Sequence, residues 1–240
     1  MLDTAVPSLA RAWDHLLGGG ASFTADRSLA QRLEALHPGL RQRLSASRAY
    51  VADRVTQVAR AGVDQYLDLG AGLPTRPSVH ASARAVLPGA RVVYVDRDPA
   101  VTEHGRALVP PGVRYVQGDL AEPEAILSSG DLAGFLDFSR PVGLVLALAL
   151  HVLDPGTARA VAGVLVRALA PGSYLIVTVA DGRQGGLPES VWPDGPAAAD
   201  VASLLAGLEL LPPGVQEGQV ITAAAVKAAA AGAGAARRRP

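Results

Sequence analysis

The stretch "YLDLGAGLPT", residues 66–75, combines an apolar run with Asp68 and with two glycines that are one residue apart. A buried strand that runs into a glycine turn often brings the main chain close to a ligand, because glycine has no side chain and tolerates unusual backbone angles. The same pattern also fits a tight strand-to-helix turn that binds nothing. The sequence therefore raises the question of whether a ligand lies at this turn, and what charge it carries.

The composition excludes several classes of function. The 240 residues include 22 basic and 22 acidic ones, so the chain lacks the positive charge with which proteins bind nucleic acids or anionic membranes. The absence of cysteine excludes disulfides, thiolate metal sites and cysteine nucleophiles. The N-terminus does not resemble a signal peptide, and no apolar run is long enough to span a bilayer. We therefore expect a cytoplasmic protein without a nucleic-acid or membrane partner.

Short apolar runs alternate with segments long enough for a crossover helix. Apolar strands that alternate with helices predict an α/β fold, with a mostly parallel sheet covered by helices on both faces. Such a sheet binds ligands at the carboxyl ends of its strands. The C-terminal part predicts a helix near residues 197–206 and an antiparallel pair of edge strands. The predicted strands are residues 65–70, 91–96, 113–119, 141–150, 173–181, 208–211 and 219–228.

The chain divides into three parts by pattern. Apolar residues recur at helical spacing from Leu40 to Val58, and Gly62 follows as a stop signal. We predict an N-terminal helical cap over residues 1–62, a Rossmann-like domain over residues 63–228 and a low-complexity tail over residues 229–240.

The glycine turn matches the dinucleotide-binding fingerprint only in part. That fingerprint, GxGxxG, needs a third glycine where helix and strand pack closely, whereas Thr75 stands at that position here. Asp68 also argues against a pyrophosphate, since a carboxylate two residues before Gly70 would repel an anion. The sulfonium of S-adenosylmethionine, which is cationic, suits the position better.

Acidic residues end the next two predicted strands. Asp96 closes "VVYVD" and Asp119 follows "VRYVQG". A carboxylate at the first position can accept hydrogen bonds from both ribose hydroxyls of a nucleoside, and one at the second can reach the adenine amine. Both residues also suit helix caps, although Asp98 can take that role from Asp96. Three successive strands with fitting ends indicate an adenosyl ligand more specifically than any one of them.

At the level of whole motifs, the sequence resembles the class I S-adenosylmethionine-dependent methyltransferases, and within them an S-adenosyl methyltransferase family common in actinobacteria. The resemblance covers roughly residues 7–211. It implies a Rossmann-like fold with strand order 3-2-1-4-5-7-6, S-adenosylmethionine as cofactor and methyl transfer as activity. The motifs that carry it are "ARAWDHLLGG", "FTADR", "SRAYV", "QYLDLGAGLPT", "VVYVDRDPAV", "GDLAEPEAIL", "ALHVLD" and "LAPGSYLIVTVADG".

The resemblance also implies which residues bind the cofactor. The glycine turn would form the cofactor loop, Asp96 the ribose contact, and Asp119 with Leu120 the adenine contact. One departure stands out: family members read "LLGGKDN" where this chain has Gly20, Ala21 and Ser22 after "LLGG". The expected cofactor-binding residues are Asp68, Gly70, Ala71, Gly72, Asp96, Arg97, Asp119, Leu120 and Ala149.

Methyl transfer needs no fixed catalytic motif, because the enzyme mainly positions the acceptor and excludes water. His151 follows the fourth predicted strand and is the first candidate for a proton acceptor, and His15 in the cap is the second; each could equally be a structural histidine. The spacing of the five histidines predicts no metal site. The neutral charge and apolar flanks favour a small-molecule acceptor.

Other functions stay open at this point. A methyltransferase fold can bind S-adenosylmethionine and catalyse another reaction, such as cyclisation or decarboxylation, or none. A nicotinamide-dependent oxidoreductase would share the fold, although the missing third glycine and Asp68 speak against it. An interaction module with an empty pocket would bind no nucleoside. The sequence does not give the acceptor atom, the oligomeric state or the pathway.

Overall fold

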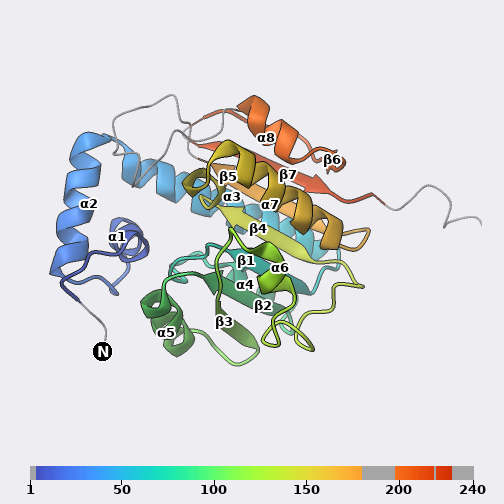
Figure 1. Cartoon of the computed structure of the whole chain (residues 1–240), viewed down its shortest axis with the longest axis horizontal. Helices are drawn as coiled ribbons and strands as arrows, with labels where there is room; N and C mark the ends of the chain where they lie inside the picture. Colours follow the sequence, from blue (N-terminus) through green and yellow to red (C-terminus); the bar gives the residue numbers. More distant parts are fainter. Residues whose placement is uncertain (1–3, 180–197, 219, 229–240) are drawn as a thin grey trace, which may run out of the picture.

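The computed structural model describes residues 4–179, 198–218 and 220–228. Within them, seven strands form one sheet in the order β3-β2-β1-β4-β5-β7-β6. All neighbours are parallel except β7, which is antiparallel to β5 and β6 (Figure 1). The predicted α/β fold and strand order are confirmed. The strands are β1 (Gln65–Leu69), β2 (Arg91–Asp96), β3 (Val113–Gln117), β4 (Gly143–Ala147), β5 (Tyr174–Val179), β6 (Glu209–Leu210) and β7 (Ile221–Val226).

Helices cover both faces of the sheet, as predicted. Helices α3 and α4 pack on one face, and α6, α7 and α8 lie on the other (Figure 1). The predicted tail, residues 229–240, lies outside the described residues. The helices are α1 (Leu9–Leu16), α2 (Thr24–Leu36), α3 (Leu40–Arg60), α4 (Val79–Arg84), α5 (Pro99–Leu108), α6 (Pro123–Leu127), the short 3-10 helix η1 (Leu150–Val152), α7 (Pro155–Ala168) and α8 (Ala198–Leu204).

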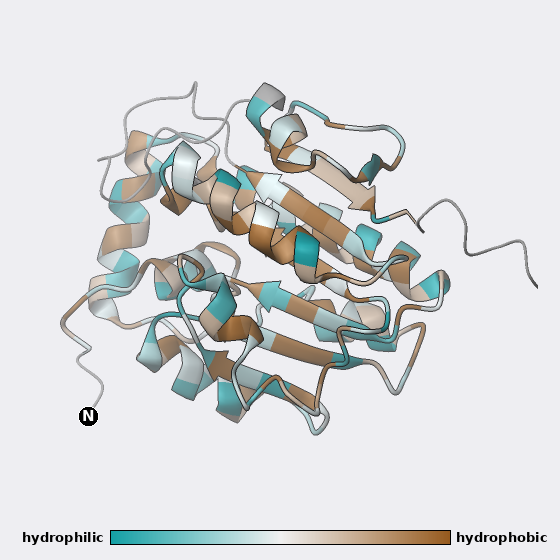
Figure 2. Ribbon diagram, turned by 45° about the vertical axis from the view of Figure 1, so that its right-hand side comes forward, coloured by the Kyte–Doolittle hydropathy of each residue, from teal (hydrophilic) through white to brown (hydrophobic). Residues whose placement is uncertain are grey.

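The strands supply two cores because their side chains alternate between the faces. In β1, Leu67 and Leu69 belong to the core under α6 and α7, whereas Tyr66 belongs to the core under α3 and α4. Coloured by hydropathy, the central strands are largely brown while polar residues line the outer faces of the helices (Figure 2). By the same alternation, Asp68 faces the α3 side.

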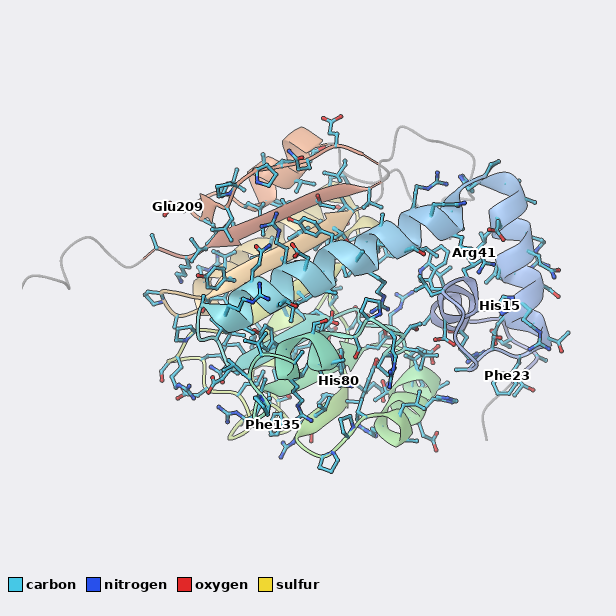
Figure 3. The ribbon with its side chains drawn as sticks, turned by 180° about the vertical axis from the view of Figure 1, so that it is seen from behind. His15, Phe23, Arg41, His80, Phe135 and Glu209 are labelled. Atoms are coloured by element: carbon cyan, nitrogen blue, oxygen red, sulfur yellow. The ribbon has the colours of Figure 1, made fainter. Side chains whose placement is uncertain are left out.

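Helix α3 packs both against the N-terminal helices α1 and α2 and against the sheet. Near its start, Leu40 and Leu44 pack with α1 and α2, and further along Val51, Val55 and Val58 pack on the sheet. Seen from behind, α3 begins beside α1 and α2 and runs from there across the sheet (Figure 3). The boundary at residue 62 stays a prediction, but the helix that precedes it ties α1 and α2 to the sheet.

A buried ion pair joins α1 to α2. Arg11 Nε donates to Asp26 Oδ2 at 2.8 Å, and both side chains are at most 5% exposed. The backbone N–H groups of Ser8 and Phe23 also donate to this carboxylate. Burial alone would raise the pKa of Asp26, but the hydrogen bonds from Arg11, Ser8 and Phe23 outweigh it and lower the pKa.

Replacing Asp26 by asparagine should destabilise the chain strongly, because Arg11 would be left as an uncompensated buried charge. We expect a loss of about 3 kcal/mol in the free energy of unfolding at pH 7, measured by urea denaturation. Since the folded state lowers the pKa of Asp26, the difference should shrink as the pH falls below 4. Glu34→Gln is the matched control on the same helix, because its pair with Arg41 is exposed. Equal effects of the two substitutions would contradict this account.

Lys227, the only lysine of the chain, caps a helix. It follows β7, and its Nζ donates to the carbonyls of Val166 at 3.0 Å and Leu169 at 2.6 Å, at the end of α7. A cation at this end of a helix satisfies carbonyls that have no partner within the helix and interacts favourably with its dipole. Its role in the described structure is therefore to join the edge strand to α7.

Lys227→Met should lower the free energy of unfolding by about 1–2 kcal/mol, because the last carbonyls of α7 lose a charged donor. Urea denaturation measures the loss, and Lys227→Arg should recover part of it. Wild-type stability of Lys227→Met would show that the contact contributes nothing.

Candidate functional site

A cavity of about 340 Å³ lies at the carboxyl ends of the parallel strands, where an α/β sheet is expected to bind ligands. The glycine loop after β1, the ends of β2, β3 and β4, and helices α1 and α3 form its walls. Its lining residues used below are Ser8, Trp13, Asp14, Leu17, Leu44, Ser47, Arg48, Gly70, Ala71, Gly72, Thr75, Asp96, Arg97, Asp98, Asp119, Leu120, Leu148, Ala149, Val152 and Leu153.

Three consecutive N–H groups of the glycine loop donate to the end of β2. Those of Gly70 and Ala71 donate to the Val95 carbonyl at 2.9 and 3.0 Å, and that of Gly72 donates to Asp96 Oδ2 at 2.8 Å. Both glycines have positive φ, +67° and +58°, which explains the residue type at these two positions. The loop is thereby fixed against the neighbouring strand.

This hydrogen bonding answers the question of ligand charge. A pyrophosphate is normally held by free backbone N–H groups at the start of a helix that follows the glycine turn directly. Here the three N–H groups are already used, and α4 begins only at Val79. The loop therefore offers no anion-binding site of the dinucleotide type.

The Asp96 carboxylate is shared between the loop and the cavity. Its Oδ1 accepts a hydrogen bond from the Asp98 N–H at 3.0 Å, in addition to the bond from Gly72. Each carboxylate oxygen can accept a second hydrogen bond, so acceptor capacity remains for hydroxyl groups in the cavity. Burial raises the pKa of Asp96, opposed by the two backbone donors. Asp98 caps α5, as the sequence suggested.

Most of the expected cofactor-binding residues share this cavity. Arg97 and Asp119 are exposed at its rim, and Leu120 and Ala149 are buried in its wall. Ala149 approaches the loop closely: a Cβ added at Gly70 would lie 2.8 Å from the Cβ of Ala149. Any side chain at position 70 would therefore displace either the loop or the end of β4.

Asp68 lies outside the cavity lining. Its side chain is 2% exposed, and its Oδ1 is buried without a hydrogen-bond partner among the described residues. Burial raises the pKa of Asp68 to about 7; the charge of Arg48 opposes the shift, and that of Asp96 adds to it. Such a carboxylate sits behind the loop and can change charge near neutral pH.

Sequence reasoning missed two neighbouring residues of α3, Ser47 and Arg48. Ser47 Oγ lies 2.7 Å from Thr178 Oγ1, which also accepts from the Leu148 N–H at 3.1 Å. Leu148 has a φ of +52°, a left-handed conformation rare for leucine and often found where structure serves function. A signal was present, since Ser47 and Arg48 are the first two residues of the motif "SRAYV".

Helix α1 contacts the glycine loop through Asp14, a further functional-site residue that the sequence analysis did not single out. Asp14 Oδ1 accepts from Thr75 Oγ1 at 2.6 Å, and Oδ2 accepts from the Ala21 N–H at 3.0 Å. Ser8 Oγ donates to Asp98 at 3.1 Å. The "GAS" segment that replaces the family's "KDN" therefore still folds onto the cavity wall, through a backbone contact that needs none of the missing side chains.

The two candidate histidines differ in placement. His15 is half-buried on α1, with Nδ1 at 3.5 Å from Ser22 Oγ, and it does not line the cavity (Figure 3). His151 belongs to η1, directly after β4, but its side chain lies outside what the structure describes. No group of His, Asp or Glu arranged for a metal is found among the described residues, and no described helix is long and apolar enough to cross a membrane.

Comparison with known proteins decides the family. Residues 1–230 match the model of the S-adenosyl methyltransferase family. The chain belongs to this family. It is a methyltransferase whose cofactor is S-adenosylmethionine, as the sequence resemblance implied. No curated protein sequence matches it.

Solved structures agree with that membership. An inferred methyltransferase from Thermobifida fusca YX is 36% identical, with 95% of this chain and 97% of that one covered and a TM-score of 0.85. A DUF574 family protein from Streptomyces avermitilis MA-4680 is 29% identical, with coverage of 94% and 99% and a TM-score of 0.81. Human N-acetylserotonin methyltransferase, solved with S-adenosylmethionine, shares the fold at 16% identity, coverage of 91% and 67% and a TM-score of 0.51.

The residues of the cavity fit the cofactor of this methyltransferase family. Asp96 and Asp119 are acceptors suited to a nucleoside, and the loop lacks free amides for a pyrophosphate. Above about pH 7, where Asp68 is ionised, its buried Oδ1, which has no hydrogen-bond partner among the described residues, adds negative potential behind the loop and favours a cation over an anion.

The raised pKa of Asp68 predicts a pH-dependent stability. The folded state holds a proton on this side chain up to about pH 7, whereas the unfolded chain releases it near pH 4. Wild type should therefore lose stability from this group as the pH rises from 4 to 7. Asp68→Asn, which mimics the neutral form, should gain stability relative to wild type over that range, measured by urea denaturation at pH 4.5, 6 and 8.

The control is Asp154→Asn. Asp154 caps α7 on the surface, and hydrogen bonds from Thr157 lower its pKa. The change in stability caused by Asp154→Asn should be opposite in sign to that of Asp68→Asn. Asp154→Asn should lower the free energy of unfolding above pH 4, and the loss should fade below that pH. A stability difference for Asp68→Asn that does not change with pH would contradict the assignment.

Proposed function

We propose that this methyltransferase moves a methyl group to a small-molecule acceptor bound in the cavity between the glycine loop and helix α1. The observation that carries the proposal is the division of the cavity lining. Polar groups cluster at the ends of β2 and β3, whereas apolar side chains gather in the part nearer α1, α3 and η1, beside the polar Asp14, Ser47 and Arg48. The apolar lining consists of Trp13, Leu17, Leu44, Leu148, Val152 and Leu153.

The polar part is the proposed cofactor site. Asp96 accepts hydrogen bonds from the ribose hydroxyls, and Asp119 with Leu120 contacts the adenine. Gly70, Ala71 and Gly72 form the floor, with Ala149 packed behind Gly70, and Arg97 lies at the rim. When bound, S-adenosylmethionine supplies a methyl group that its sulfonium already activates.

The apolar part is the proposed acceptor site. Its leucines and Trp13 exclude water and hold the acceptor against the cofactor, which is the main contribution an enzyme makes to methyl transfer. A cavity of about 340 Å³ suits small ligands. His151 is the proposed proton acceptor for an acceptor hydroxyl or amine, supported by its place directly after β4. His15 on α1, the second candidate, does not line the cavity and would have to turn toward it to act on the acceptor.

Ligand-dependent thermal unfolding tests the cofactor site. S-adenosylmethionine and S-adenosylhomocysteine at 100 times their dissociation constants should each stabilise the wild type by about 2.7 kcal/mol, and NAD(H) should have no effect. Asp96→Asn keeps an oxygen for the Gly72 N–H but loses the charge, and should weaken both adenosyl ligands about tenfold. Asp64→Asn is the control, because Asp64 pairs with Arg140 at the opposite end of β1.

Product formation separates methyl transfer from the alternatives. Release of S-adenosylhomocysteine with a panel of small acceptors, and its loss in His151→Asn, would support the proposal. Cofactor binding without release on any small, protein or nucleic-acid acceptor would favour a protein that binds the cofactor for another purpose. Stabilisation by NAD(H) alone would overturn the cofactor assignment.

A further inference from the structure

Arg48 is a cationic side chain of the cavity wall that forms no ion pair with any described residue. It comes from α3 and lines the cavity beside the glycine loop. Among the described residues, no Asp or Glu oxygen lies within 4.0 Å of its guanidinium nitrogens, unlike those of Arg11 and Arg140. An arginine that lines a ligand cavity and forms no close ion pair there has donors suited to an anionic group of a ligand.

The hydrogen bonds that Arg48 does form are weak. One nitrogen, Nη2, donates to the carbonyls of Leu73 at 3.3 Å and Ala71 at 3.5 Å, both longer than the usual 2.9 Å. A guanidinium has five N–H donors in a planar fork that matches a carboxylate. Most of the binding capacity of Arg48 is therefore unused by the described residues.

Position within the sheet indicates which part of the cofactor Arg48 meets. The proposed adenosine contacts lie at the ends of β2 and β3, on one side of β1 in the sheet order: Asp96 is the last residue of β2, and Asp119 follows β3. Ser47, the residue before Arg48, is fixed by Thr178 at the end of β5, on the other side of β1. A cofactor whose nucleoside lies over β2 and β3 extends its other end across the glycine loop toward α3.

We propose that Arg48 binds the α-carboxylate of the methionine part of S-adenosylmethionine, a positioning role that rests on the proposed function. The zwitterionic end of the cofactor carries this one carboxylate, and a bidentate pair with a guanidinium fixes its orientation as well as its place. Fixing that end orients the sulfonium and its methyl group relative to the apolar part of the cavity.

A different role for Arg48 would be to neutralise Asp68 and support the loop. In that case its loss would affect every ligand of the loop alike, whether or not the ligand has a carboxylate. Ligands that differ only at this end therefore separate the two roles. S-adenosylhomocysteine carries the carboxylate, its methyl ester has no charge there, and 5′-methylthioadenosine lacks the amino-acid end.

Isothermal titration calorimetry with these three ligands tests the proposal. Arg48→Met should weaken S-adenosylhomocysteine about 10- to 100-fold and change the affinity for 5′-methylthioadenosine less than twofold. Arg48→Lys keeps the positive charge but not the planar fork of donors, so its affinity for S-adenosylhomocysteine should lie between those of the wild type and Arg48→Met. On the unaltered protein, the methyl ester should bind as weakly as S-adenosylhomocysteine binds to Arg48→Met. Arg97→Met is the matched control. This cavity-lining arginine follows β2, on the side of the nucleoside that all three ligands share, so its replacement should change their affinities by the same factor.

If Arg48→Met weakened the binding of all three ligands by the same factor, or of none of them, this proposal would be overturned and the proposed function would be left intact. Equal binding of S-adenosylhomocysteine and its ester to the wild type would do the same without any substitution. A wild-type protein that binds none of the three would overturn both proposals.

Discussion

The hydrogen bonds between residues 70–72 and the end of β2 are the constraint on which the rest of the site depends. They join two neighbouring strands at the edge where the cavity lies, and they turn the Asp96 carboxylate toward that cavity. Because they use the loop's own N–H groups, they also decide which ligands the loop can accept. One set of backbone bonds thus holds the loop, orients the acidic residue and removes the usual means of binding a pyrophosphate.

Charge is distributed unevenly around this loop. Asp68 is buried behind it, Asp96 and Asp119 lie on one side, and Arg48 lies on the other. The Oδ1 of Asp68 has no hydrogen-bond partner among the described residues, and a buried carboxylate oxygen of this kind costs folding free energy; such costs concentrate at functional sites. The nearby Arg48 offsets part of this cost, so the polar groups of the site depend on one another across two strands and a helix.

Much of the fold follows from the sequence because each strand is a short apolar run that ends in a polar or glycine turn. The edge strands were predicted too, although "LELL" forms only the two-residue strand Glu209–Leu210. The site was harder to predict. Asp96 ends β2 and Asp119 closely follows β3, where local pattern is informative, whereas Arg48 and Asp14 lie inside helices. Their contacts with Ala71 and Thr75 depend on how α1 and α3 pack against a loop far along the chain, which local pattern does not encode.

Helix α1 forms a wall of the cavity but contributes little to the two cores that hold the sheet together. Its attachment to the loop passes through a few polar contacts, such as Asp14 to Thr75. Substitutions at inward-facing positions such as Trp13 and Leu17 can therefore reshape the chamber while the strands stay as they are. During evolution, substitutions in this short N-terminal segment could change which acceptor fits the cavity. The strands and loops proposed to bind S-adenosylmethionine would remain under separate selection.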